Sequence, residues 1–324
     1  MITYERLSQR PQAARSLLGM SLQEFDNLYI EFALAHAERQ MNETKTRRGQ
    51  KRRQRAVGAG AKHKHSLKNR LVMTLFWLRV YMTYEVLGFF YELDKTNIED
   101  NLKDILATLD EMTSFNYDHP KGKKPKLNSV SAVMDAFPDV RLVIDAKEQR
   151  IQRPKNTKDQ DGNQQDKQRP YYSGKKKTHT LKNQFAVAPD GFIEHVSDSV
   201  PGGANHDLTL LRQTNLLSHL SEDEAAMLDK GYDGIQNDYP DTRIYQPFKA
   251  RRNKPLTEEQ KAYNRFLSGY RIVVEHTLAQ ANRFEVLRQV YRHDREDHSQ
   301  IVRIVSGLVN RRIQSVPLKS YTAA

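Results

Sequence analysis

Apolar positions recur with two different periods along the chain, and this divides it into two parts. Phe25, Leu28 and Phe32 stand at helical spacing, so residues 1–43 are expected to be helical. Helical periodicity resumes at Leu67 and predicts three helices, over 67–83, 83–93 and 95–112. Short helices joined by a tight turn at 93–96 are typical of a helix-turn-helix unit, although any small helical bundle shows a similar pattern.

After residue 137 the pattern changes to short apolar strands alternating with helices. Strand-like runs end at Asp145 and Asp229, a third covers 242–248, and Asp190-Gly191 between two apolar runs indicates a β-hairpin. Helices are expected over 207–219, from a capping box at Thr257 to about residue 283, and over 298–313. This order of elements predicts a mixed α/β domain.

The balance of charge narrows the class of partner. The chain has 52 Lys and Arg against 40 Asp and Glu, a formal net charge of +12. Such an excess favours a polyanion, but it does not choose between DNA, RNA and an anionic membrane. The absence of cysteine excludes disulfides, thiolate zinc sites and cysteine catalysis. No apolar run approaches the roughly 20 residues that span a bilayer, and no signal-peptide core is evident, so we expect a cytoplasmic, nucleoid-associated protein without a membrane partner.

Three carboxylates are the candidates for chemistry. Asp145 and Asp229 each end an apolar run, and strand ends are where α/β folds place their sites. Glu275 lies within the apolar stretch Ile-Val-Val-Glu of the long helix, where a lone buried carboxylate is costly and needs a cation. Clustered carboxylates raise one another's pKa, which a divalent ion relieves. Taken singly, each of the three is more often a cap or a salt-bridge partner than a catalytic group.

A set of motifs in a fixed order distinguishes these three from the other acidic residues. In order, the motifs are VRLVIDAKEQRIQRP, YYSGKKKTHTLKNQFAVAPDGFI, PGGANHDLTLLR, LDKGYDG and YRIVVEHTLAQANRFEVL. Together they resemble the Asp–Asp–Glu (DDE) insertion-sequence transposases, in particular the group related to the Harbinger elements. The resemblance covers about residues 140–290, and residues 64–113 resemble the helix-turn-helix module of the same family.

This resemblance implies an RNase H-like fold in which Asp145, Asp229 and Glu275 are the catalytic residues and the metal ligands. It implies Mg²⁺ or Mn²⁺ as cofactor, with two ions per site. The implied partners are double-stranded DNA, both element inverted repeats and target DNA, and further copies of the chain in a dimer or larger synaptic assembly.

Residues around the three carboxylates are interpreted with their alternatives open. Arg271 either orients Glu275, contacts DNA or forms a structural ion pair. The family favours a lysine at position 282, where this chain has Asn282, and Arg283 is a possible substitute. We expect Asp207 to cap its helix and Tyr232 to pack near the site. The possible accessory residues of the site are His206, Asp207, Lys230 and Tyr232. Basic residues are candidates for DNA binding, as a backbone clamp or as a solvated run: Arg47, Arg48, Lys51, Arg52, Arg53, Lys175, Lys176 and Lys177.

The domain organisation that follows has six parts: a helical region (1–43), a basic linker or arm (44–66), a helix-turn-helix DNA-binding domain (67–118), a basic linker (119–136), an RNase H-like catalytic domain (137–314) and a tail (315–324). The predicted function is a DNA transposase that binds terminal inverted repeats, cleaves phosphodiesters with activated water and joins the 3′-hydroxyl ends to target DNA. The alternatives are a domesticated DNA-binding protein that no longer transposes and a nuclease of the same fold.

Overall fold

The computed structural model describes the chain except for residues 48–61, 113–136, 159–163, 251, 253–254 and 316–324. Two compact units are distinguished: one contains residues 1–114, 283–286 and 303–308, and the other contains residues 115–282, 287–302 and 309–324. None of the helices in the described ranges is both long and apolar enough to cross a bilayer. The domain boundaries expected from the sequence remain predictions.

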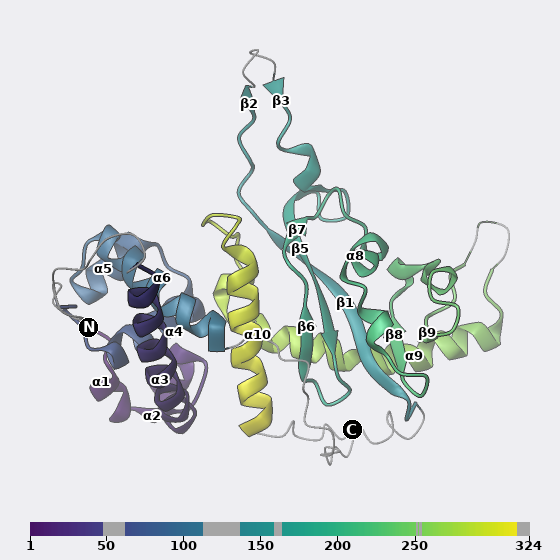
Figure 1. Ribbon diagram of the computed structural model, residues 1–324. Coiled ribbons are helices and arrows are strands. Elements are labelled where there is room, and N and C mark those ends of the chain that lie inside the picture. The colour runs from purple at the N-terminus through teal and green to yellow at the C-terminus, as the bar shows by residue number, and fades with distance from the viewer. Residues whose placement is uncertain (48–61, 113–136, 159–163, 251, 253–254, 316–324) are drawn as a thin grey trace. The chain divides into compact units, whose positions relative to one another are not determined.

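The first unit is built from helices. They are α1 (Tyr4–Ser8), α2 (Pro11–Leu18), α3 (Leu22–Arg47), α4 (Leu67–Val80), α5 (Tyr84–Tyr91) and α6 (Lys95–Met112) (Figure 1). Side-chain caps fix their starts: Ser66 accepts from the Asn69 amide at α4, and Asp94 accepts from the Asn97 amide at α6. Trp77 of α4 is 1% exposed, so it is a core residue.

The turn between α5 and α6 depends on a glycine. The Leu93 amide donates to the Gly88 carbonyl at 3.0 Å, and a Cβ on Gly88 would lie 2.4 Å from the Leu93 carbonyl oxygen. Glu92 caps α5 in the left-handed region, with φ of 51°. The close return of the chain at this point therefore requires glycine, and α6 packs against α5 after the turn.

A mixed sheet forms the centre of the second unit. Its strands run in the order β4 (Tyr172–Ser173), β5 (Thr178–Val187), β1 (Val140–Arg150), β8 (Ala225–Leu228) and β9 (Arg243–Tyr245). Two further strands, β6 (Ile193–Val196) and β7 (Val200–Pro201), pair with β5. β1 is antiparallel to β5 and parallel to β8. Beyond β1 a hairpin of β2 (Thr157–Lys158) and β3 (Gln164–Gln165) projects from the sheet (Figure 1).

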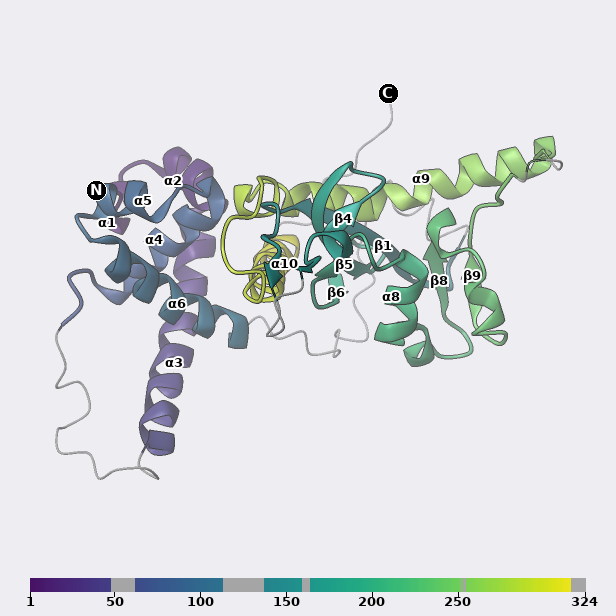
Figure 2. The ribbon, with the colours of Figure 1, turned by 90° about the horizontal axis from the view of Figure 1, so that it is seen from above.

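Helical segments cover both faces of this sheet (Figure 2). On one face, Leu142 and Ile144 of β1 pack with α8 (Asp207–Thr214) and with the short 3₁₀ turns η2 (Leu216–His219), η3 (Lys230–Tyr232) and η4 (Ile235–Asn237). On the other lies α9 (Glu258–Ala281), whose Thr277 hydroxyl donates to the Gly191 carbonyl at 3.0 Å. α10 (His298–Ser315) is tied to β6 through Asn310 and the Ile193 backbone. The predicted mixed α/β class is confirmed.

Two boundaries differ from those expected. β1 does not end at Asp145 but continues to Arg150, because its polar second half pairs with β5 up to Arg150↔Thr180. The helix expected over 207–219 ends at Thr214, where Asn215 adopts a left-handed conformation and a 3₁₀ turn follows. The capping box predicted at Thr257 and Gln260 is present at the start of α9.

Candidate active site

The site lies where β1 loses one of its two neighbouring strands. Pairing of β1 with β8 runs to Ile144↔Leu228, whereas pairing with β5 continues beyond it. Asp145 and Asp229 each follow one member of this last pair. Because the two strands are parallel, the two carboxylates leave the sheet side by side. Asp145 thus stands within β1 rather than at its end, and it is the end of β8 that opens space beside it.

One guanidinium lies between these two aspartates. Arg271 of α9 donates to Asp229 Oδ1 at 3.0 Å, and its other terminal nitrogen lies 4.0 Å from Asp145 Oδ2. Its side chain is 17% exposed, and its buried Nε lacks a hydrogen-bond partner. Arg271 therefore pairs with the aspartates, which is the ion-pair alternative among the three that the sequence left open.

Backbone amides orient both carboxylates. Asp145 accepts a hydrogen bond from the Ala146 amide at 2.9 Å, and Asp229 accepts one from the Lys230 amide at 2.6 Å. Burial raises the pKa of Asp145, and the negative charges of Asp229 and Asp207 raise it further. The Ala146 amide and Arg271 oppose this rise without cancelling it. The region is thus short of positive charge, which is the condition in which a cation binds.

Glu275 lies about one helical turn after Arg271 on α9, and it is exposed. Arg271, Glu275, Leu278 and Asn282 share one helical face by their spacing. The burial argument made from the apolar stretch around Glu275 was wrong, because its neighbours Val273 and Val274 take the buried positions of the helix. Within the described residues, no three His, Asp or Glu side chains are close enough together to share a metal ion.

The residues that are present nonetheless fit a divalent cation. Asp145 and Asp229 converge on a single positive group, and their oxygens are the donors that Mg²⁺ and Mn²⁺ prefer. The mutual repulsion of Asp145, Asp229 and Asp207 is not fully balanced by Arg271. Asp145 and Asp229 are therefore side chains that could hold such an ion between them.

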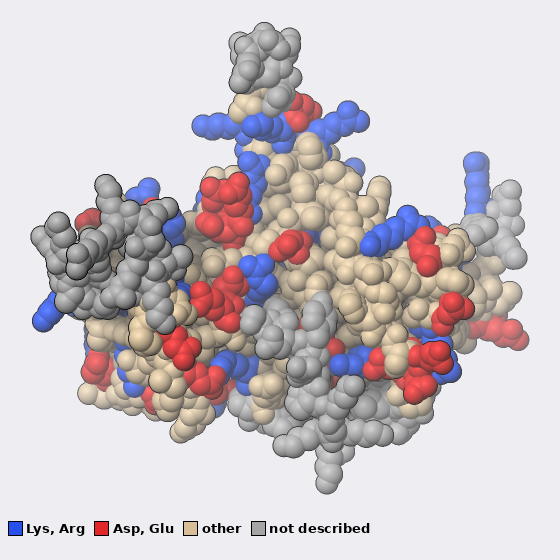
Figure 3. All heavy atoms as spheres, in the orientation of Figure 1, with Lys and Arg blue, Asp and Glu red and all other residues tan. Residues whose placement is uncertain are grey.

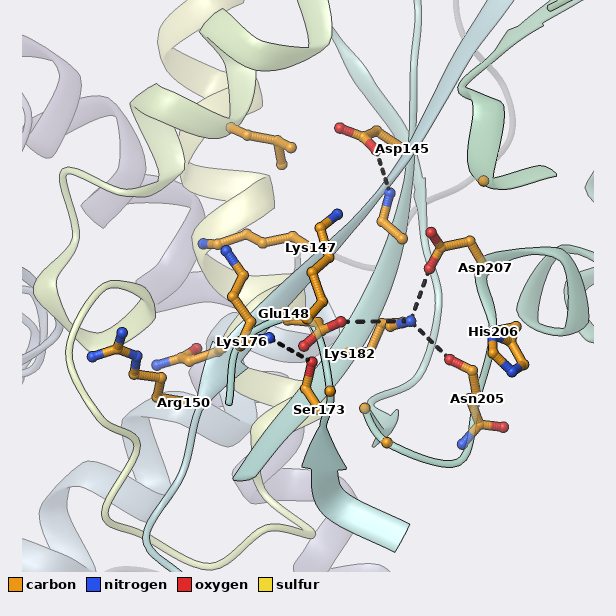
Figure 4. Close-up of a pocket in the computed structure, with 18 of the residues that line it drawn as sticks. Asp145, Lys147, Glu148, Arg150, Ser173, Lys176, Lys182, Asn205, His206 and Asp207 are labelled. Carbon is orange, nitrogen blue, oxygen red and sulfur yellow. Dashed lines mark hydrogen bonds and ion pairs between the residues drawn. The ribbon is translucent and has the colours of Figure 1, made fainter. Parts of the chain in front are cut away.

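A cavity of about 790 Å³ opens beside Asp145 (Figure 4). It follows the free edge of β1 from Asp145 to Arg150, between Leu278 and Asn282 on one side and residues 202–207 on the other. Basic residues line much of it: Lys147, Arg150, Lys175, Lys176, Lys182 and Arg288. Two of the three lysines predicted to track a polyanion thus border the cavity, and Lys177 is exposed and donates its amide to the Ser173 carbonyl.

A buried ionic network forms one wall of the cavity. Lys182 of β5 donates to Asp207 Oδ1 at 2.8 Å and to the Asn205 carbonyl at 2.7 Å, and it lies 3.7 Å from Glu148 Oε1 (Figure 4). The Asp207 carboxylate comes so close to Gly231 that a Cβ there would lie 2.8 Å from its Oδ2. Gly231, the first glycine of LDKGYDG, therefore allows α8 to approach the loop that carries Asp229.

The predicted cap at Asp207 was wrong. The cap residue of α8 is His206, without a side-chain bond, and Asp207 is the first helical residue. Lys182 attracts its carboxylate, and this ion pair replaces the bond to the helix amides. His206 borders the cavity, and Lys230 is exposed. Tyr232 is fully buried and its hydroxyl accepts from Gln184 at 3.2 Å, in keeping with the packing role expected for it.

Other candidates lie away from this cavity or outside the described residues. Arg283 is exposed and does not belong to the described lining of the cavity. Arg48, Lys51, Arg52 and Arg53 of the predicted arm fall outside the described residues, as does the side chain of Arg47. The linker at 119–136 and nearly all of the tail do so as well.

Sequence reasoning missed the residues that complete the site. Lys147 and Glu148 come two and three residues after Asp145, and they were not expected to belong to the strand because the apolar run ends at Asp145. Lys182 lies opposite Glu148 only through the register of β1 with β5. The strict alternation of side chains past Asp145 was the available signal for Lys147, which falls on the same face two residues later.

Comparison with known proteins agrees with this geometry. A family model described as DDE superfamily endonuclease matches residues 144–310, which include Asp145, Asp229 and Glu275. The chain therefore belongs to the DDE superfamily endonucleases, and the family predicted from the motifs is confirmed. It is 28% identical over 255 residues to the probable transposase for insertion sequence element IS702 of Microchaete diplosiphon, covering 78% of this chain and 82% of that protein.

Among solved structures, the chain matches the piggyBac transposase synaptic complex with hairpin DNA. The match has a TM-score of 0.37 and 10% sequence identity, over 85% of this chain and 72% of that one.

Proposed function

We propose that this protein is an insertion-sequence transposase that cuts DNA phosphodiesters at the ends of its element and joins the freed 3′-hydroxyls to target DNA. The observation that carries the proposal is the convergence of Asp145 and Asp229 on one cationic position within the matched endonuclease region. The relative named as a transposase, aligned over most of both chains, supports strand transfer beyond cleavage. An RNase H-like arrangement of the sheet and helices is part of the same proposal.

The three carboxylates have separate tasks. Asp145 and Asp229, held by the Ala146 and Lys230 amides, would hold the two divalent ions of the site. Glu275, four residues after Arg271 on α9, is the third ligand. When bound, the ions activate water for attack on a phosphodiester and stabilise the leaving oxygen. Before the ions bind, Arg271 balances part of the negative charge of the two aspartates.

The basic wall of the cavity binds the DNA strand that enters the site. Lys175 and Lys176 line the cavity, and the chain on either side of the β2–β3 hairpin carries further exposed cations: Arg153, Lys155, Lys167 and Arg169. Lys and Arg side chains gather there on the surface as well (Figure 3). Such a run of cations attracts the phosphate backbone of DNA and releases counterions from it.

The helical unit recognises the inverted repeat. In a helix-turn-helix the second helix presents its N-terminal residues to the major groove. Here α6 follows the turn after α5, and its first residues Lys95, Thr96 and Asn97 are exposed. The arm at 47–55 adds contacts to the backbone, two copies or more hold the two element ends together, and the protein acts in the cytoplasm at the nucleoid.

A cleavage and strand-transfer assay tests the proposal. The substrate is a duplex carrying the repeats that flank the gene, with MgCl₂ and a plasmid target. We expect Asp145→Asn, Asp229→Asn and Glu275→Gln each to lower cleavage by about a hundredfold or more, since the loss of metal-assisted stabilisation is worth several kcal/mol. Glu258→Gln, an exposed glutamate of the same helix α9, is the matched control and should retain activity.

The products separate the proposal from its alternatives. Cleavage with strand transfer supports a transposase, and cleavage without transfer indicates a nuclease. Specific binding without cleavage by the wild-type protein indicates a binding protein. If Glu275→Gln behaves like Glu258→Gln while both aspartate variants are inactive, Glu275 is not a metal ligand.

A further inference from the structure

Two lysines of neighbouring strands reach the cavity, and they differ in whether a carboxylate balances their positive charge. Lys182 extends from β5 and Lys147 from β1. Both line the cavity beside Asp145 (Figure 4). A lysine in such a wall is stable only when an anion or several acceptors replace the water it has lost. The partners of each ammonium therefore show whether it serves the fold or awaits a ligand.

Lys182 is neutralised within the protein. Its ammonium is bonded to Asp207 and lies within ion-pair distance of Glu148, with the Asn205 carbonyl as a third acceptor. Thr180 donates its hydroxyl to the same Glu148 carboxylate at 2.9 Å. This network has no positive charge left for a ligand, so Lys182 is a structural residue of the cavity wall.

Lys147 has acceptors but no counter-charge. Its ammonium donates to the side-chain oxygen of Asn282 on α9 and to the Leu287 carbonyl at 3.2 Å. Both acceptors are neutral, and no carboxylate of the described chain forms an ion pair with Lys147. Lys147 follows Asp145 by two residues on the same strand, so both side chains leave the same face of β1. Among the described residues, Lys147 is thus a cation of the cavity wall without a carboxylate partner, on the face of β1 that carries Asp145.

We infer that Lys147 binds a phosphate of the DNA strand next to the bond that is cut. The inference rests on the proposed function, because that function brings a phosphodiester to Asp145. A phosphate oxygen supplies the negative charge that Lys147 lacks, and it leaves Asn282 and Leu287 as the acceptors that aim the ammonium. Arg283, the possible substitute named from the sequence, is not part of the described lining of the cavity, whereas Lys147 is.

The contact between Lys147 and Asn282 offers a direct test. Their side chains touch, so a lysine at position 282 can place its ammonium close to where that of Lys147 lies. Three forms are compared: Lys147→Met, the exchanged double variant Lys147→Met/Asn282→Lys, and the control Lys261→Met, which removes an exposed lysine of α9 that pairs with Glu258. Each is titrated with a labelled duplex carrying the repeat and the cleavage site, in EDTA and at several salt concentrations.

We expect Lys147→Met to bind this duplex about tenfold more weakly, with a salt slope lower by about one, as for the loss of one phosphate contact. The exchanged variant should recover most of the affinity, and Lys261→Met should bind as the wild type does. On a shorter duplex that stops before the cleavage site, Lys147→Met and wild type should bind equally. The melting temperature of Lys147→Met without DNA should be equal to or above that of the wild type, because an uncompensated charge has been removed.

Equal affinity of Lys147→Met and wild type on the long duplex would overturn the inference. So would a lower melting temperature of Lys147→Met together with no recovery in the exchanged variant, since this would mark Lys147 as a structural residue. Cleavage by the wild-type protein is measured in parallel with magnesium. If the wild type cleaves and Lys147 has no effect, the inference alone fails, whereas a wild type that binds but never cleaves contradicts the proposed function.

Discussion

At the scale of single residues, Arg271 decides what state the site is in before a metal binds. It bonds Asp229 and approaches Asp145, and Asp145 nevertheless has a raised pKa because burial and the charges of Asp229 and Asp207 outweigh it. One guanidinium opposite two carboxylates leaves a net negative charge. A divalent ion added between the aspartates neutralises this negative charge, and it competes with the guanidinium for the same carboxylate oxygens.

Replacing Arg271 with Met should therefore make the protein more dependent on magnesium. Without metal, two partly buried carboxylates lose their counter-ion, and we expect the melting temperature to fall by a few degrees, corresponding to about 1–3 kcal/mol. Millimolar MgCl₂ should raise the melting temperature of the variant more than that of the wild type, because binding energy adds to stability. Thermal unfolding followed by circular dichroism measures both effects.

The matched control is Arg212→Met, which breaks a pair with Asp238 that is half exposed. Exposed pairs are worth little, so this variant should melt close to the wild type and respond to magnesium equally. An Arg271→Met protein whose response to magnesium matches that of the control would show that Asp145 and Asp229 do not hold the ion.

At the scale of elements, the sequence predicts what local pattern determines. The capping box of α9 and the hairpin at Asp190-Gly191 were correctly expected, because caps and turns are encoded within a few residues. The length of β1 was not, since its second half is polar and is held by β5, some 30 residues later. The ion pairs of Lys182 depend on that same register, so no local pattern reveals them.

The helical unit depends on one aspartate that joins three helices. Asp104 of α6 accepts from His36 and Arg39 of α3 and from Arg70 of α4. Asp104→Asn should weaken the unfolding free energy of this unit by on the order of 2 kcal/mol, less than for a fully buried pair because the Asp104 side chain is 20% exposed. Urea unfolding followed by the fluorescence of Trp77, the single tryptophan, measures it.

The effect of this change depends on pH in a defined direction. Burial acts to raise the pKa of Asp104, but the hydrogen bonds from His36 and Arg70 and the charge of Arg70 outweigh it and hold the pKa below its ordinary value of 3.8. A carboxyl with a lowered folded pKa contributes stability above its unfolded pKa and loses it in acid. The difference between wild type and Asp104→Asn should thus be constant from pH 5 to 8 and shrink below about pH 4. Glu99→Gln, an exposed partner of Lys103, should cost only a few tenths of a kcal/mol at any pH.

At the scale of the whole molecule, buried histidines set the response to acid. His298 at the start of α10 links two parts of the second unit: its Nε2 lies 2.9 Å from the Gln149 side-chain oxygen of β1, and its Nδ1 lies 2.6 Å from Ser199 Oγ. Because the Gln149 oxygen only accepts, Nε2 carries the hydrogen and Nδ1 accepts from Ser199. Burial, with a smaller effect from the charge of Lys147, lowers the pKa of His298 to about 3. Burial likewise lowers the pKa of His195 to about 4.

The free energy of unfolding should therefore decrease as the solution is acidified, over the pH range between the unfolded and folded pKa values of His298. A histidine with a lowered folded pKa is neutral in both states above pH 6.5, and only the unfolded chain takes up the proton between 6.5 and about 3. Each such group costs up to about 1.4 kcal/mol per pH unit in that window. Urea unfolding followed by far-ultraviolet circular dichroism should show this slope.

The variant His298→Gln tests this origin, because its amide can replace both hydrogen bonds of the imidazole. Its free energy of unfolding should be lower than that of the wild type at pH 7.5, but it should decrease less between pH 7.5 and pH 5. His206→Gln removes an exposed histidine and should show the pH dependence of the wild type; if His298→Gln shows that same dependence, His298 does not supply the acid sensitivity.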